Sequence, residues 1–327
     1  MKLKYAYLFF LIFFSSCENQ TIQNKGIYKS VDSLKVENEK AQFSESGNSE
    51  MKKKSTKLSD LDFDIGYFSG QAEIATYQLK KARYEVMHPG EAILIFVTEP
   101  FLIDEQVKAD QPTDENSIKV LKMNRIDRFT TGIYDYSKFT SVFTPLQKFK
   151  AKYPMKITMG SQDWCGQTFT QINNNEGFDY EHKSYFESEG DTSLHFDYVF
   201  TEDNMMNLAR LSHDLLPVDE FTVFPSLAYL RTSHVEMKNY KAIGSMDSTE
   251  TGFFYVYEIP ELKRSVRFFI SSENQNRITR WEETYPTVFD GVLRTSIYEL
   301  KGVELLPYWK LNKKEDSRLR KSLNLMY

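Results

Sequence analysis

Apolar and polar side chains alternate at every second position along several segments, and this period of two most constrains the fold. In one such segment Phe178, Tyr180 and Phe186 face one side, while Asp179 and Glu181 face the other. A period of two is typical of a β-strand with one solvated face. The chain also contains 25 Phe and 20 Tyr, and aromatic side chains favour strands. The sequence therefore predicts a mainly β protein.

Other segments predict hairpins. Gly252 to Ile259 and Ser265 to Ile270 flank a short segment that begins with proline, which is typical of a hairpin. Ala92 to Val97 is a continuous apolar run, as expected of a strand buried on both faces. His88-Pro89-Gly90 has turn chemistry and predicts a hairpin between residues 84–86 and that run.

Two helices are expected to interrupt the strands. The first begins after Thr201, which can cap it, and Glu202 and Asp203 suit its positive N-terminal end. A second helix is predicted between Glu315 and Leu325. The expected architecture is a large antiparallel sheet, strongly curved or rolled into a partial barrel, with one or two helices packed against it. If this unit has two lobes, they should meet near residues 200–217.

Cys17 follows a segment that is typical of a bacterial lipoprotein signal peptide. A positively charged start, an apolar run from Tyr5 to Phe14 and two serines precede this cysteine. The run is shorter than the roughly 20 apolar residues that a membrane-spanning helix needs, and it fits an export signal. We therefore expect removal of residues 1–16 and lipid attachment at Cys17. The expected location is the cell envelope, at the outer membrane.

The remaining chain is expected to have two parts. Residues 17–60 carry the lipidated cysteine and a polar segment that is too poor in apolar residues to form a core, which indicates a tether. Residues 61–327 should form one β-rich domain. The net charge is −5, and an acidic chain is a poor candidate for binding nucleic acid.

Cys165 is the one local feature that hints at catalysis. A nucleophilic cysteine needs a nearby base, and Asp163 is adjacent, while His182 or His195 would approach if the strands pair. Cys17 is the only other cysteine, so acylation there excludes an intramolecular disulfide and a multi-cysteine metal site. Because a free cysteine is more often buried and structural, we expect Cys165 to pack in the core, and it is only a weak catalytic candidate.

No metal or cofactor site is expected. The five histidines form no HExxH or HxH pair, and there is no GxGxxG, GxxxxGK[ST] or GxSxG motif. Carboxylate pairs occur at Glu187/Glu189 and Glu282/Glu283, and solvated charge is the expected role of both pairs. The segment Arg264 to Phe269 combines basic and aromatic residues, and we interpret it as a surface strand with exposed charges.

Several short strings occur together in this chain: Ala72-Glu73-Ile74, Arg83-Tyr84, Leu94 to Glu99, Val107 to Asp110, Thr131 to Tyr134, Trp164-Cys165-Gly166 and Ser184 to Glu189. As a set they resemble a family of lipoproteins from Bacteroidota with no established activity. The resemblance runs from about Tyr67 to the C-terminus. Some members of that family are labelled "septum formation inhibitor Maf". This chain lacks the S-x-S-P-R-R-like loop of Maf nucleotide pyrophosphatases, so that activity is not expected.

Three function hypotheses stay open at this point. The first is a non-enzymatic envelope protein that binds a lipid, a glycan or a protein partner in an apolar cavity or on an apolar patch. The second is a structural or assembly factor of the envelope. The third is an enzyme that uses Cys165 or a carboxylate such as Glu99 or Glu187. The membrane, through the N-terminal lipid, is the expected partner in all three cases.

Overall fold

The computed structural model describes residues 70–147 and 150–326. The predicted signal peptide, the lipid attachment at Cys17 and the whole predicted tether lie outside the described residues. Within the described part of the chain, no helix is both long and apolar enough to cross a bilayer.

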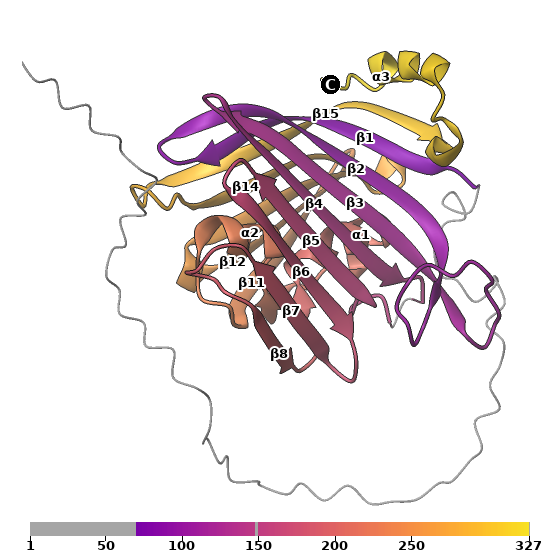
Figure 1. Cartoon of the computed structure of the whole chain (residues 1–327), viewed down its shortest axis with the longest axis horizontal. Helices are drawn as coiled ribbons and strands as arrows, with labels where there is room; N and C mark the ends of the chain where they lie inside the picture. The colour runs from indigo at the N-terminus through magenta and orange to yellow at the C-terminus, as the bar shows by residue number, and fades with distance from the viewer. Residues whose placement is uncertain (1–69, 148–149, 327) are drawn as a thin grey trace, which may run out of the picture. The chain divides into compact units, whose positions relative to one another are not determined.

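One curved sheet of 15 strands dominates the structure, which confirms the predicted mainly β fold (Figure 1). Neighbouring strands are antiparallel, except that β9 and β10 run parallel. The strands are β1 (Ala72–Arg83), β2 (Val86–Leu102), β3 (Ser117–Thr131), β4 (Tyr134–Pro145), β5 (Lys156–Asp163), β6 (Gly166–Asn174), β7 (Phe178–Ser184), β8 (Thr192–Phe196), β9 (Phe200–Thr201), β10 (Asp219–Phe224), β11 (Tyr240–Thr249), β12 (Gly252–Ile259), β13 (Arg264–Ser271), β14 (Arg277–Pro286) and β15 (Leu293–Leu306).

The sheet is an almost closed ring of two meanders. Strands β1 to β8 follow one another in space, strands β9 to β15 do the same, and β15 pairs with β1. The two edge strands, β8 and β9, are joined by residues 197–199 alone. Because each residue spans at most about 3.6 Å, this connection holds the two edges close together at that end. Phe196 of β8 also stacks on Phe224 of β10, with 4.7 Å between the ring centroids.

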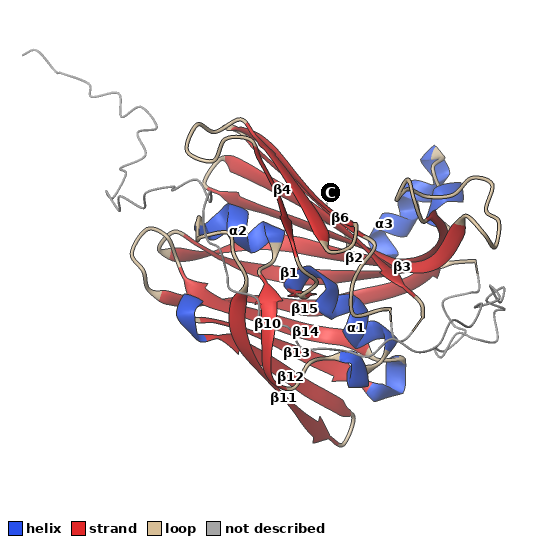
Figure 2. Ribbon diagram, turned by 90° about the horizontal axis from the view of Figure 1, so that it is seen from below, coloured by secondary structure: helices blue, strands red, loops and turns tan. Residues whose placement is uncertain are grey.

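Two short helices fill the space inside the curved sheet. Every residue of α1 (Met205–Leu211) is buried, and its apolar side chains belong to one core together with Tyr77, Phe96 and Trp281. Helix α2 (Leu227–Ser233) lies between the same two halves of the sheet (Figure 2). These helices confirm the prediction of one or two packed helices, and they fill the interior where an apolar ligand was one expectation.

A C-terminal segment with α3 (Leu319–Ser322) covers part of the outer face. Leu323 packs against Ile74 and Ile93, and the hydroxyl of Thr76 donates a hydrogen bond of 2.6 Å to the carbonyl of Leu323. The outer face of β1 and β2 is therefore covered by the protein itself.

Two sequence predictions were wrong in detail. The first hairpin turns at residues 84–85, because Arg83 pairs with Val86, and His88-Pro89-Gly90 lies inside β2. Thr201 makes no side-chain cap bond, since Glu202–Asn204 forms a 3-10 turn before α1 begins. Glu202 was predicted to stabilise the positive N-terminal end of the helix. Its carboxylate instead contacts residues of other strands, as described below.

Candidate functional site

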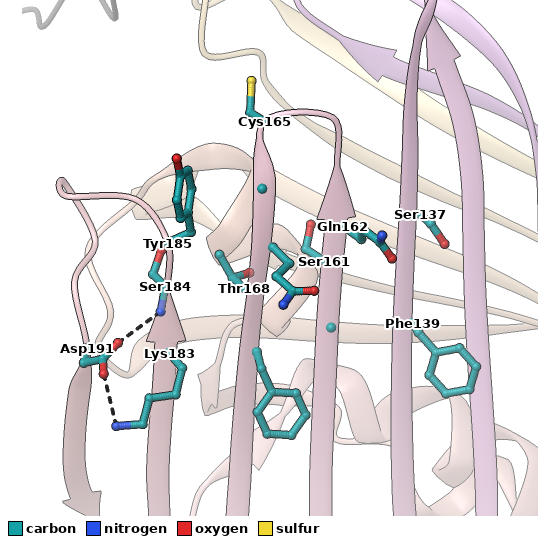
Figure 3. A pocket seen from close by; sticks show the side chains of 14 residues that line it. Ser137, Phe139, Ser161, Gln162, Cys165, Thr168, Lys183, Ser184, Tyr185 and Asp191 are labelled. Atoms are coloured by element: carbon teal, nitrogen blue, oxygen red, sulfur yellow. Dashed lines mark hydrogen bonds and ion pairs between the residues drawn. The ribbon is translucent and has the colours of Figure 1, made fainter.

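An open groove of about 610 Å³ lies on the outer face of strands β4 to β7 (Figure 3). Its lining comes from two adjacent rows of side chains that cross these strands, together with the β5–β6 turn and the start of the β7–β8 loop. The lining residues are Ser137, Phe139, Gly160, Ser161, Gln162, Cys165, Gly166, Gln167, Thr168, Phe169, Lys183, Ser184, Tyr185 and Asp191.

The first row is apolar and has a slot at its centre. Phe139 pairs with Gly160 in the sheet register, and Gly160 pairs with Phe169. The rings of Phe139 and Phe169 are 42% and 47% exposed. A Cβ atom added to Gly160 would meet no atom within 4 Å. Since neighbouring strands lie about 4.8 Å apart, the backbones that carry the two phenylalanines are roughly 10 Å apart. Between the two rings lies a slot whose floor is the backbone at Gly160.

The second row is polar. Ser137 pairs with Gln162, and Gln162 pairs with Gln167. Within the described residues, the side chains of these three residues make no hydrogen bond. Each amide can both donate and accept a hydrogen bond, so this row offers several free partners to a ligand.

The groove carries no net charge. Lys183 and Asp191 are the charged residues of its lining, and their Nζ and Oδ2 atoms lie 3.3 Å apart (Figure 3). The backbone N–H of Ser184 also donates to Asp191 at 3.2 Å, and this bond, with the ammonium group of Lys183, lowers the pKa of that carboxyl. The groove therefore attracts neither anions nor cations strongly.

Cys165 is exposed, contrary to the prediction that it packs in the core. It lies with Trp164 in the two-residue turn between β5 and β6, where Asp163 pairs with Gly166. Its sulfur points away from the other labelled side chains of the groove (Figure 3). The alternation of buried and exposed side chains ends where β5 ends and resumes where β6 begins. Cys165 lies between the two strands, so that pattern does not direct its side chain into the core.

The two histidines that were expected to approach this thiol are engaged elsewhere. His182 contacts Thr170 and Glu189, and His195 contacts Asp179 at 2.7 Å. The Oδ1 atom of Asp163 accepts the backbone N–H of Cys165 at 2.9 Å and the hydroxyl of Tyr134 at the same distance. Asp163 therefore shapes the turn, and the geometry does not activate the sulfur.

A second cluster of functional groups lies inside the sheet, and the sequence analysis missed it. The Nε atom of Arg264 lies 3.0 Å from Oε1 of Glu202, which also accepts the hydroxyl of Tyr257 at 2.7 Å. Arg125 contacts Asp127 at 2.7 Å and Glu283 at 2.8 Å. We call these five charged residues the interior ion-pair network.

The network's three carboxylates outnumber its two guanidinium groups, and Lys81 beside it supplies further positive charge. Burial alone would raise the pKa of Glu283, but the positive charges of Arg125, Lys81 and Arg264 outweigh it and hold that pKa far below its usual range. The adjoining cavity, between Lys81, Lys138 and Glu283, has about 10 Å³, which is room for roughly one water molecule. The network therefore has space for a water but not for a substrate.

Arg264 was expected on the surface and Glu283 as a solvated charge, and both are buried. A signal for this was present in the sequence. Arg264 stands in phase with Val266, Phe268 and Ile270 on the apolar face of its strand, so its side chain had to point inward. The presence of an in-phase charge predicts a buried ion pair, although it does not identify the partner on another strand.

The remaining carboxylate candidates do not form sites. Glu187 is exposed, while Glu189 is held by Arg231 at 3.0 Å and by Ser184 at 2.7 Å. Glu99 pairs with Lys122 at 2.7 Å. The described residues contain no group of three or more His, Cys, Asp or Glu side chains that could hold a metal ion.

Comparisons with known proteins give distant structural neighbours. No family model and no curated protein matches the sequence. A β-barrel-like protein from Brucella abortus, of domain of unknown function DUF1849, has 7% identity and a TM-score of 0.36, covering 72% of this chain and 98% of that one. A porin-like protein from Bacteroides uniformis has 9% identity and a TM-score of 0.22, covering 71% and 96%.

Proposed function

We propose that this chain is a lipid-anchored protein of the cell envelope that binds a neutral glycan, without catalysis, in the outer groove. The observation that carries this proposal is the combination, in one groove, of an exposed aromatic row and an adjacent row of unpartnered amide and hydroxyl groups. The envelope location and the anchor rest on the sequence before Cys17.

A sugar ring fits both rows at once. Its faces carry C–H groups, which pack on aromatic rings such as Phe139 and Phe169, and its edge carries hydroxyls. These hydroxyls would bond to Ser137, Gln162 and Gln167, which replace the hydrogen bonds that the sugar makes with water. Because the rows run side by side across the strands, one extended chain of sugars would contact both.

Other ligand classes fit the groove less well. An anionic headgroup or a phosphate polymer would need uncompensated positive charge, and Lys183 is already paired with Asp191. An acyl chain would leave one whole side of the groove, the amide row, desolvated and without hydrogen bonds. A neutral polyhydroxylated ligand avoids both penalties.

Two observations favour binding over catalysis. His182 and His195 are engaged by Thr170, Glu189 and Asp179 rather than by the exposed thiol of Cys165, and the carboxylates of the interior network are each engaged by a guanidinium group in a space without room for a substrate. Binding without bond cleavage needs only the groove.

A glycan array tests the proposal directly. The chain from residue 17 onward, with Cys17→Ser, would carry an added peptide tag and be detected with a labelled antibody, which leaves Cys165 in the groove lining unmodified. We expect signals from neutral glycans. Gly160→Trp places an indole ring in the slot, where the added Cβ atom meets nothing within 4 Å, and should weaken binding at least tenfold. Ile243→Trp, an exposed position on β11, is the matched control and should bind normally.

Three results would contradict the proposal. They are the absence of any neutral-glycan signal, signals confined to anionic glycans, and equal binding by the Gly160→Trp variant. Circular dichroism of both tryptophan variants shows whether either substitution disturbs the fold.

A further inference from the structure

The antiparallel register brings seven connections of this sheet to the same end, including those between β10 and β11 and between β12 and β13. Since β1 to β8 alternate in direction, the β1–β2, β3–β4, β5–β6 and β7–β8 connections lie at one end of the strands. Strand β15 runs antiparallel to β1, so the β14–β15 connection lies at that end too (Figure 1). The other end holds a different set of connections.

Five of these seven connections, those that join β1–β2, β3–β4, β5–β6, β7–β8 and β14–β15, each present a large apolar side chain to solvent. Ile133 is 82% exposed, Tyr185 75%, Phe289 70% and Trp164 59%. Val86, beside the β1–β2 turn, is also exposed. We call these five residues the apolar rim. Polar residues and glycine normally dominate turns, so five apolar tips at one end need an explanation.

We infer that the apolar rim is a membrane-contact surface that inserts into the interface of a lipid bilayer. The five side chains stand on separate loops, so each can enter between lipids by itself. Tyr and Trp are the residue types that favour the boundary between headgroups and acyl chains, and Ile, Val and Phe suit the apolar layer beneath it. A bilayer is also the partner that the sequence before Cys17 places next to this domain.

A lipid surface explains the rim better than a protein partner does. A stable protein interface needs a contiguous, shape-matched patch of about 800 Å² on each side. The rim instead distributes its apolar groups around the end of a curved sheet. The insertion needs no anionic lipid, because the chain is acidic, so we expect it to depend on apolar contact and to resist salt.

Vesicle binding without the acyl chain tests this inference independently of the groove. The chain from residue 17 onward with Cys17→Ser would be mixed with phosphatidylcholine vesicles and sedimented. We expect binding that persists in 0.5 M salt, about the concentration at which charge contacts are screened within a few ångströms. The fluorescence of Trp164 should shift to shorter wavelength. The double change Ile133→Ser, Phe289→Ser should weaken binding at least tenfold.

A matched control uses Phe254→Ser, which removes an exposed phenylalanine from the face of β12 rather than from the rim, and it should bind vesicles normally. The rim substitutions lie in exposed turns and should keep the fold, which circular dichroism checks. Failure of the Cys17→Ser chain to bind vesicles, equal binding by the double variant, or capture of a protein partner by the rim without vesicle binding would overturn the inference.

Discussion

At the residue scale, the charges inside the sheet matter most for stability. Within the interior ion-pair network, Glu283 of β14 and Arg125 of β3 form a buried pair. Buried ion pairs are weak evidence for net stabilisation, but removing one partner leaves an uncompensated charge, which is strongly destabilising. The network therefore makes the fold intolerant of single charge deletions.

Glu283→Gln should lower the free energy of unfolding by about 3–5 kcal/mol, because Arg125 then keeps a buried charge with one carboxylate fewer. Urea denaturation measures this change. Glu299→Gln removes the partner of Arg280 in an exposed pair and should cost less than about 1 kcal/mol. Equal effects of the two substitutions would contradict the structural role of the network.

Asp203 should give a pH dependence of the opposite sign to that of an ordinary ion-paired carboxylate. Burial raises its pKa to about 6, although Leu227 and Ser226 donate hydrogen bonds to it. A carboxyl whose folded pKa exceeds its unfolded pKa binds more protons in the folded state, so its contribution falls as pH rises through 6. Between pH 7 and pH 5 the contribution should grow by roughly 1 kcal/mol.

Urea titrations at pH 5, 6 and 7 of the parent chain and of Asp203→Asn measure that contribution as a difference. The variant should lack the gain at pH 5, because an amide does not titrate. The comparison cancels the histidines and the other carboxylates, which both chains share. A difference that is constant with pH would show that Asp203 has the same pKa in both states.

At the element scale, α1 is fixed to the sheet by asparagine side chains as well as by apolar packing. Asn204, just before α1, accepts the hydroxyl of Thr144 at 2.6 Å and donates to the carbonyl of Ala151 at 2.9 Å. Asn207 donates to the carbonyl of Leu121 and to the hydroxyl of Thr144. The carbonyl of Leu121 in β3 and the hydroxyl of Thr144 in β4 thereby find hydrogen-bond partners on α1 and on the residue before it.

Asn204→Ala should lower the free energy of unfolding by about 2–4 kcal/mol, because the buried groups of Thr144 and Ala151 would lose their partner. Chemical denaturation measures the loss. Asn175→Ala removes an exposed hydrogen bond to Asp179 and should change stability by less than about 0.5 kcal/mol. A small effect at Asn204 would mean that water reaches this site.

The sequence predicted local structure well and long-range contacts poorly. The alternation in residues 178–187 predicted a strand, which the structure has over Phe178–Ser184, and the hairpin predicted in residues 252–270 is confirmed, because period and turn chemistry are local properties. The groove depends on register across β4, β5 and β6, which brings Phe139, Gly160 and Phe169 into line. No single segment contains that information. Cys165 was misplaced because burial statistics for cysteine outweighed its position in a two-residue turn.

At the scale of the whole molecule, the acyl anchor and the apolar rim would both hold the domain at a membrane. Cys17→Ser should move the protein from the detergent phase to the aqueous phase in a detergent phase separation, since acyl chains contribute about 0.8 kcal/mol per buried methylene. Mass spectrometry of the parent protein should find the acylated N-terminal cysteine. An unmodified Cys17 in envelope protein would contradict the anchor.

The pairing of β1 with β15 has a consequence for how the molecule reaches its folded state. Within each meander every strand pairs with its neighbour in sequence, so these contacts form early and at little cost in loop entropy. The β1–β15 ladder joins Ala72 to Leu306 and has the largest sequence separation in the sheet. Since β15 is the last of these fifteen strands to be synthesised, β1 keeps an unpaired edge until all the others have been made, and this interval is when the protein most needs protection from aggregation.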